Sequence, residues 1–432
     1  MCLMFGPFMI FTSFSSSVAS TQSATVNPSL RGFPNPDLQA FGHYGQSAAS
    51  SPGNLMVTGA PNETVDGLVG AGQVFTFSTT LGALHGNMTS PNAQAFGHFG
   101  RAVAISPACD TKACQPIKVH NRCLLYACTL IVGAANETVE GIVGAGHAYL
   151  FNTNTSALVR TLASPNAQYD GQFGWSVTVG GSLVIVGAPN ETVDGNVGAG
   201  RAYVFDALNG KLITTLSDPS PQTNGRFGES VSVSDNSQAN PSMVVVGAPG
   251  QTVNGSVGAG QAYVFDLRSG ELISTLSSPT PQSNGWFGWS VSLTLNIVAV
   301  GAPKETSKGF ILAGNAYGFT ANTGELLYTL KDPNAQRGGE FGWSVWLSEQ
   351  TVGVGAPGEA VRGFSGAGYV YTFQDQTGQL VKQYASPHPQ ADGSFGDSIT
   401  LVQGPGFPGY IIGIGAPDES ASGYIQSGNL YV

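Results

Sequence analysis

Acidic side chains recur at one fixed place in this sequence. A glutamate follows a Gly-Ala-Pro tripeptide, or its variant Gly-Ala-Ala at 133–135, after one intervening residue in six of seven copies, with Gln251 in the seventh; these are Glu63, Glu137, Glu191, Glu305, Glu359 and Glu419. A carboxylate can accept two hydrogen bonds from exposed loop amides, and it can also be an oxygen ligand for a hard cation. The recurrence favours the structural role, and weak cation binding and contact with a ligand are the alternatives.

Aromatic and charged residues share a second repeated position, directly after a Phe-Gly pair. This position holds Trp175, Trp289 and Trp343, and it holds Arg101, Glu229 and Asp397 in three other copies. Aromatic faces attract cations, so these six residues are the candidate binding residues if they meet at the rim of a central channel. The alternative is that the tryptophans fill space between neighbouring units. Trp286, just before its Phe-Gly pair, is expected to be exposed.

Catalytic patterns are missing from the sequence. Its six histidines have no metal-site or triad spacing, and the G-x-S-x-G, H-E-x-x-H and P-loop motifs do not occur. The Gly-x-Gly runs lack the helix that a dinucleotide site requires. We therefore expect no catalytic residues, no cofactor and no enzyme activity.

Four cysteines lie close together in an insertion at about residues 106–128: Cys109, Cys114, Cys123 and Cys128. Their spacing, C-x4-C-x8-C-x4-C, is not that of a usual zinc finger. In a secreted chain the set predicts two disulfides, for which three pairings exist. A metal site is the alternative.

Glycosylation acceptors of the form Asn-x-Ser/Thr also recur. Four are expected at equivalent positions, at Asn62, Asn136, Asn190 and Asn254, and two more are Asn87 and Asn154. In a secreted protein the four would place glycans on one face of the molecule. The alternative is that the tripeptide was duplicated with the repeat and carries no glycan.

Composition and the first residues point outside the cell. Residues 1–20 are apolar from Cys2 to Phe14 and then turn to small residues, which is typical of a secretory signal peptide, although no Lys or Arg precedes the apolar stretch. The alternative is that the start of the sequence is truncated or misassigned. Net charge is -10 and basic residues form no cluster, so we expect no nucleic-acid partner. No other stretch is long and apolar enough to predict a transmembrane segment.

The elements that must position these residues are short strands. Seven repeats, mostly of 54–60 residues, each contain Phe-Gly or Tyr-Gly, then Gly-Ala-Pro, then an aromatic segment such as the RAYVFDA at 201–207. Alternating and β-branched runs bounded by Gly predict four strands per repeat. The chain is therefore expected to be all-β, with residues 21–432 forming one seven-bladed β-propeller of four-stranded antiparallel blades. Residues 27–38 resemble the fourth-strand segment 158–168, so an N-terminal strand is expected to close the ring.

Phe-Gly followed by Gly-Ala-Pro, in tandem, resembles the FG-GAP repeat family, which includes the propeller of integrin α subunits. The resemblance implies an extracellular adhesion or scaffolding propeller without catalysis in the repeats. In integrins a comparable aromatic rim receives a cationic side chain from a partner subunit. The family's Asp-rich calcium loop is missing here; Asp235, Asn236 and Asn240 are at most its remnant, so no calcium site is carried over.

Two functions follow as hypotheses. The first is a non-catalytic, secreted interaction module that binds an extracellular protein or glycan. The second is a structural subunit of an extracellular filament, layer or matrix, in which copies of the chain assemble through the propeller rims.

Overall fold

The structure is a computed structural model that describes residues 30–51, 55–79, 82–106, 117–119, 122–124, 129–234, 243–348, 350–403 and 410–432. For residues 117–119, 122–124, 401–403 and 410–411 it describes the backbone only. Within these ranges the regular elements are all strands, β1 to β30.

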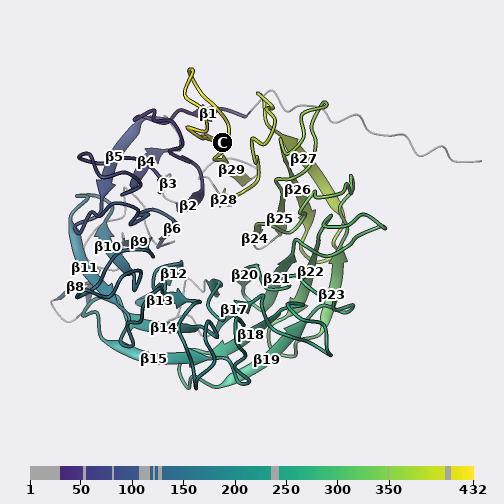
Figure 1. Cartoon of the computed structure of the whole chain (residues 1–432), viewed down its shortest axis with the longest axis horizontal. Coiled ribbons are helices and arrows are strands. Elements are labelled where there is room, and N and C mark those ends of the chain that lie inside the picture. The colour runs from purple at the N-terminus through teal and green to yellow at the C-terminus, as the bar shows by residue number, and fades with distance from the viewer. Residues whose placement is uncertain are drawn as a thin grey trace, which may run out of the picture.

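Seven four-stranded antiparallel sheets stand in a ring, which confirms the predicted seven-bladed propeller (Figure 1). Their strands, in chain order, are β2 (Ser47–Ser51), β3 (Leu55–Ala60), β4 (Gln73–Ser78) and β5 (Leu84–Thr89) in blade one; β6 (Ala102–Ile105), β9 (Thr129–Ala134), β10 (His147–Asn152) and β11 (Leu158–Ala163) in blade two; β12 (Ser176–Gly180), β13 (Leu183–Ala188), β14 (Arg201–Asp206) and β15 (Leu212–Ser217) in blade three; β16 (Ser230–Val233), β17 (Met243–Ala248), β18 (Gln261–Asp266) and β19 (Leu272–Ser277) in blade four; β20 (Ser290–Thr294), β21 (Ile297–Ala302), β22 (Asn315–Thr320) and β23 (Leu326–Leu330) in blade five; β24 (Val345–Leu347), β25 (Thr351–Ala356), β26 (Tyr369–Gln374) and β27 (Leu380–Ala385) in blade six; and β28 (Ile399–Gln403), β29 (Tyr410–Ala416), β30 (Asn429–Tyr431) and β1 (Gly32–Phe33) in blade seven. A separate hairpin pairs β7 (Ile117–Val119) with β8 (Arg122–Leu124).

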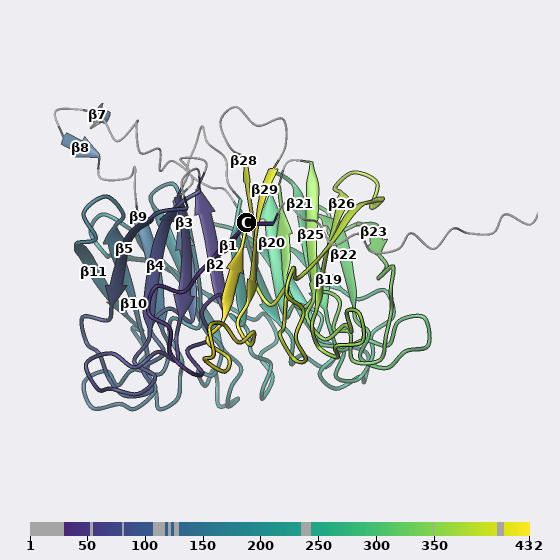
Figure 2. The same ribbon diagram turned by 90° about the horizontal axis from the view of Figure 1, so that it is seen from above.

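The first strand of each blade is innermost and the fourth is outermost (Figure 1). Because the strands are antiparallel, the loops between second and third strands lie at the same end of the ring as the connections between blades. Figure 2 shows this end opposite the β7–β8 hairpin. We call it the loop face.

The aromatic residue of each Phe-Gly or Tyr-Gly pair is fully buried inside its blade. Phe173, for example, lies 5.8 Å from the ring of Tyr203 and 5.9 Å from that of Phe205, both on the third strand. Buried edge-to-face aromatic contacts combine a large apolar area with a favourable geometry. This triplet is therefore the core of the blade, and equivalent contacts recur around the ring.

The glycines of the two motifs meet across the boundary between blades. A Cβ built on Gly187, in a Gly-Ala-Pro, would lie 2.1 Å from the carbonyl oxygen of Gly228, in the next blade's Phe-Gly. The Ser176 hydroxyl donates to the same oxygen at 2.8 Å. The same contacts join the last blade to the first, because Ser398 donates to the Gly45 carbonyl at 2.7 Å beside Gly415. Only a glycine allows two backbones to approach this closely.

Strand β1 adds the fourth strand to blade seven. Gly32 pairs with Tyr431 and Phe33 with Leu430, so the order in this sheet is β1-β30-β29-β28. The N-terminal segment thus lies beside the last strand of the chain. Its contribution to closing the ring stays a prediction, which a truncation tests.

Candidate interaction site at the axis of the loop face

The six residues that follow the Phe-Gly pairs lie at the inner ends of the first strands, on the loop face. Glu229 is buried, and Arg101, Trp175, Trp289, Trp343 and Asp397 are half-buried. Four neighbours join them: Arg226, Trp286, Lys304 and Glu340. We call these ten residues the axial cluster.

One half of the axial cluster is a chain of contacts across blades two, three and four. The Arg101 guanidinium carbon lies 3.6 Å from the centre of the Trp175 ring. The Trp175 Nε1 donates to Glu229 Oε1 at 3.0 Å, and Glu229 forms an ion pair with Arg226 at 2.6 Å. A cation over an aromatic face is attracted by the ring quadrupole, so Arg101 holds Trp175 in place while Trp175 orients Glu229.

The other half is a group of three tryptophans. Trp286 stacks on Trp289 with ring centres 5.0 Å apart, and Trp289 lies 4.8 Å from Trp343. The Lys304 amine is 5.3 Å from the rings of both Trp286 and Trp343, and it forms an ion pair with Glu340. The expectation that Trp286 is exposed is wrong, because this stacking leaves it half-buried. Cations of the chain itself thus occupy aromatic faces in both halves.

Asp397 completes the cluster on the side of blade seven. Burial and the nearby charge of Asp418 raise its pKa to about 7, although a hydrogen bond from Trp343 and the charge of Arg101 act in the opposite direction. Asp418 accepts a hydrogen bond from Ser394 at 2.7 Å and lies 3.6 Å from His43 in blade one. The site therefore carries a carboxyl group that titrates near neutral pH.

Three predicted glycosylation acceptors lie beside the axial cluster. The side-chain amides of Asn62, Asn136 and Asn190 are half-buried and contact His43 at 3.2 Å, His98 at 2.9 Å and Gln172 at 2.8 Å. Asn62, Asn136 and Asn190 are held in place by these contacts at the positions that follow Gly-Ala-Pro or Gly-Ala-Ala. Glycosylation at each of them stays a prediction.

Asn254 does not share this position, and the predicted equivalence is wrong. It lies in an exposed turn with φ of 50°, where blade one has Asp66, because Gly250 occupies the place that corresponds to Asn62. The Asn-x-Ser/Thr pattern thus stands at a different distance from Gly-Ala-Pro in this blade. Asn87 and Asn154 are exposed.

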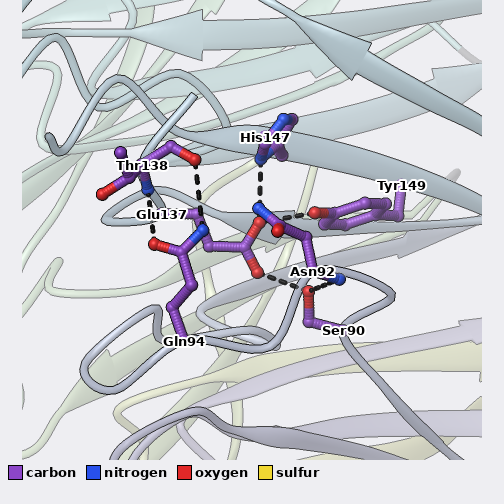
Figure 3. A network of polar contacts seen from close by, with 7 residues as sticks. All are labelled: Ser90, Asn92, Gln94, Glu137, Thr138, His147 and Tyr149. Carbon is purple, nitrogen blue, oxygen red and sulfur yellow. Dashed lines mark hydrogen bonds and ion pairs between the residues drawn. The ribbon is translucent and has the colours of Figure 1, made fainter. Parts of the chain in front are cut away.

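The repeated glutamates are fully buried, so the prediction that they bond exposed loop amides is wrong. Figure 3 shows the example of Glu137: its Oε2 accepts from the Tyr149 hydroxyl at 2.5 Å and lies 2.8 Å from His147 Nδ1. Ser90, from the end of the preceding blade, donates to Oε1. The carboxylate thus joins two blades, and its role is structural.

In blade four, Gln251 replaces the glutamate, and its contact across the boundary is also different. Four other boundaries pair a serine with the glutamate, and Glu63 and Glu359 have Asn35 and Asp332 in its place. The boundary of blade four places Asp218 opposite Gln251, and the Gln251 amide donates to the Asp218 carboxylate. Donor and acceptor have exchanged sides, so the contact between blades is kept. Elsewhere burial raises the pKa of Glu191, Glu305, Glu359 and Glu419, and it raises that of Glu63 to about 8.

A second set of contacts, which was not predicted from the sequence, joins the connection between two blades to the loop between the second and third strands of the next blade. In blade three the Gln168 side chain accepts from the Thr192 amide at 2.8 Å and donates to the Thr192 carbonyl at 3.2 Å. Figure 3 shows the same pair of hydrogen bonds between the Gln94 side chain and the Thr138 backbone. The signal was present, because a glutamine stands five residues before every Phe-Gly or Tyr-Gly: Gln39, Gln94, Gln168, Gln222, Gln282, Gln336 and Gln390.

One segment of the chain matches a known protein family. The model of the FG-GAP repeat matches residues 158–205, which run from β11 to β14 and contain one Phe-Gly pair, one Gly-Ala-Pro and the contacts between Gln168 and Thr192. This part of the seven-bladed ring therefore matches an FG-GAP repeat. A search of curated proteins gave no match.

Several predicted features lie outside the described residues. These are the signal peptide at 1–20, the loop with Asp235, Asn236 and Asn240, and the side chains of Cys109, Cys114, Cys123 and Cys128. In the part of the chain that the structure describes, no group of three or more His, Cys, Asp or Glu is placed to hold a metal ion. A search of the same residues finds no helix with the length and apolar character to cross a membrane.

Proposed function

We propose that this FG-GAP propeller is a non-catalytic extracellular interaction module that binds a protein or glycan through the axial cluster. FG-GAP propellers are typically interaction modules and are usually extracellular. The observation that carries the proposal is the gathering of half-buried tryptophans with charged partners at one end of the ring. Aromatic and arginine side chains are the residues that most often dominate binding energy.

The contacts within the cluster suit recognition more than catalysis. The tryptophan rings are already held by these cations and by one another, so a ligand that takes the place of a cation on a ring face does not have to order the ring. Arg101 and Lys304 can turn toward an anionic group, and Glu229 and Glu340 toward a cationic one. Binding is therefore expected to be sensitive to salt and to the charge of the ligand.

A glycan array and a pull-down from the extracellular environment, both with secreted protein, test the proposal. The double variant Trp289→Ala/Trp343→Ala is expected to lose binding by roughly tenfold or more. Leu295→Ala is the matched control, since Leu295 is exposed in the turn at the opposite end of the ring. Equal binding by wild type and the double variant would reject the axial cluster as the site.

A further inference from the structure

An exposed apolar ring surrounds the axial cluster on the loop face. The residue two places after each turn glycine at positions 67, 141, 195, 255, 309 and 423 is an exposed aliphatic, and aromatic side chains lie among them. The set, each member 45–72% exposed, is Val69, Val143, Val197, Val257, Ile311, Ile425, Phe41, Phe96, Tyr169, Phe310, Phe364 and Tyr424. Members on neighbouring loops are adjacent, since the Phe96 amide donates to the Val69 carbonyl and the Phe41 amide to the Ile425 carbonyl. Exposed apolar patches typically mark interaction sites.

Charged residues stand along this ring on tight turns. Each turn has a residue with φ near 50° followed by a glycine whose missing side chain would meet no atom within 4 Å, so the tips are free. The tips of blades two and three carry Glu140 and Asp194, and those of blades five and six carry Lys308 and Arg362. All four are exposed, although Lys308 also donates one hydrogen bond to the Asp332 carbonyl at 2.6 Å.

The connections between blades repeat this division. Asp170 lies between blades two and three, Arg337 lies between blades five and six, and both are exposed. Blade four, between the two halves, has the uncharged Asn254 at its tip. On these tips and connections the exposed charges are therefore acidic at blades two and three and basic at blades five and six, and the exposed Asp392, between blades six and seven, departs from this division.

We propose that the loop face pairs with the loop face of a second copy, about a two-fold axis that runs through blade four. In a seven-bladed ring this axis places blade two opposite blade six and blade three opposite blade five. Glu140 then faces Arg362 and Asp194 faces Lys308, while Asp170 faces Arg337. Each contact occurs twice, so both charged halves are neutralised and the apolar rings meet.

The exposed apolar area and the charges of the loop face fit a second copy of the chain. A stable interface buries about 800 Å² on each partner, and six half-exposed aromatic rings alone offer on the order of 500 Å². Three exposed carboxylates are exceptions to the charge match. Asp37 lies between blades seven and one, at the other end of the same axis, and would meet its own copy, whereas Asp66 would face Ser422 and Asp392 would face Phe96.

The pairing of two loop faces does not depend on the proposed function, but it would affect ligand binding at the axial cluster. Two loop faces in contact would cover both axial clusters, so a ligand and the second copy compete for the same surface. Increasing the protein concentration is then expected to weaken apparent ligand binding.

Sedimentation velocity across a concentration series, at low and high salt and without any ligand, tests the pairing. Wild type is expected to form a dimer that salt weakens. Arg362→Glu is expected to weaken dimerisation about tenfold, because like charges then meet twice, and adding Glu140→Arg is expected to restore it. Asp37→Asn is expected to strengthen the dimer.

Arg268→Glu is the matched control, because Arg268 is exposed in the turn between β18 and β19, at the opposite end of the ring. It makes the same charge change and is expected to leave dimerisation unchanged. A wild-type monomer at every concentration overturns the proposal. So does self-association that Arg362→Glu leaves unchanged, which would indicate assembly through other rims. Loss of ligand binding in the axial variants does not affect these readouts, so the two proposals fail separately.

Discussion

At the scale of single residues, the buried glutamates show how the blades are held together. Glu191, for example, accepts from Tyr203 of its own blade at 2.5 Å and from Ser164 at the end of the preceding blade. Removing a buried acceptor leaves its donors without partners, and this costs more than the hydrogen bonds contributed.

Glu191→Ala is expected to lower the free energy of unfolding by about 3 kcal/mol. Glu191→Gln is expected to cost less, because the amide oxygen still accepts a hydrogen bond. Urea unfolding measures both, with Asp194→Ala at an exposed tip nearby as the control. Equal stability of Glu191→Ala and the control would show that the buried network does not join the blades.

Titration of the buried carboxyls makes stability depend on pH in an unusual direction. An unfolded Glu has a pKa near 4, whereas burial raises the folded pKa of Glu63 to about 8 and that of Asp397 to about 7. Between about pH 4 and 8 the folded protein binds more protons than the unfolded chain, so stability falls as pH rises.

The urea midpoint is therefore expected to be higher at pH 5 than at pH 8. Glu63→Gln carries no titrating group at this site and is expected to reduce the fall, whereas Asp66→Asn at an exposed turn is expected to leave it unchanged. A midpoint that rises between pH 5 and pH 8 would contradict this account of the buried carboxyls.

At the scale of elements, the Phe-Gly and Gly-Ala-Pro motifs are the two sides of one contact between blades. The sequence predicted the strands well, because β-branched and aromatic runs bounded by glycine recur in every repeat. The reason for the glycines became visible only with the ring closed, since Gly187 and Gly228 belong to different repeats.

Gly187→Ala is expected to destabilise the protein by about 3 kcal/mol or more, because its Cβ would overlap the Gly228 carbonyl. Gly195→Ala is the matched control: its φ is 81°, but its side chain would enter open space, so only about 1 kcal/mol of backbone strain is expected. Thermal unfolding separates the two. Similar losses would mean that the contact between blades does not explain the glycine at 187.

The site was less predictable than the fold. The spacing after Phe-Gly brought Trp175, Trp289 and Trp343 to one end of the first strands, because side chains at equivalent positions of a propeller face the same axis. Which cation covers which ring depends on contacts between repeats, such as Lys304 between Trp286 and Trp343, and periodicity carries no information on these.

At the scale of the whole molecule, the first and last described strands share a sheet, β1 beside β30. An N-terminal strand that completes the last blade holds a ring together and covers the edge that β30 would otherwise expose. Residues of opposite chain ends then contribute to one cooperative unit.

Removing the residues before Pro34 is expected to lower the melting temperature and to make the C-terminal strand accessible to proteases. Limited proteolysis with mass spectrometry measures this, and Phe33→Ala tests the buried contact alone, since Phe33 packs edge-on against Phe77 of blade one. Unchanged stability of the truncated chain would show that the ring closes without this strand.

The central claim is that ligands bind at the axial cluster of the loop face. Hydroxyl-radical labelling read by mass spectrometry, with and without a ligand found by the array or pull-down, tests it most directly. We predict that the ligand protects Trp175, Trp289 and Trp343 and leaves Leu295 and Leu380, exposed elsewhere on the ring, labelled as before. Protection at Leu295 or Leu380 with unchanged labelling of the three tryptophans would contradict the claim.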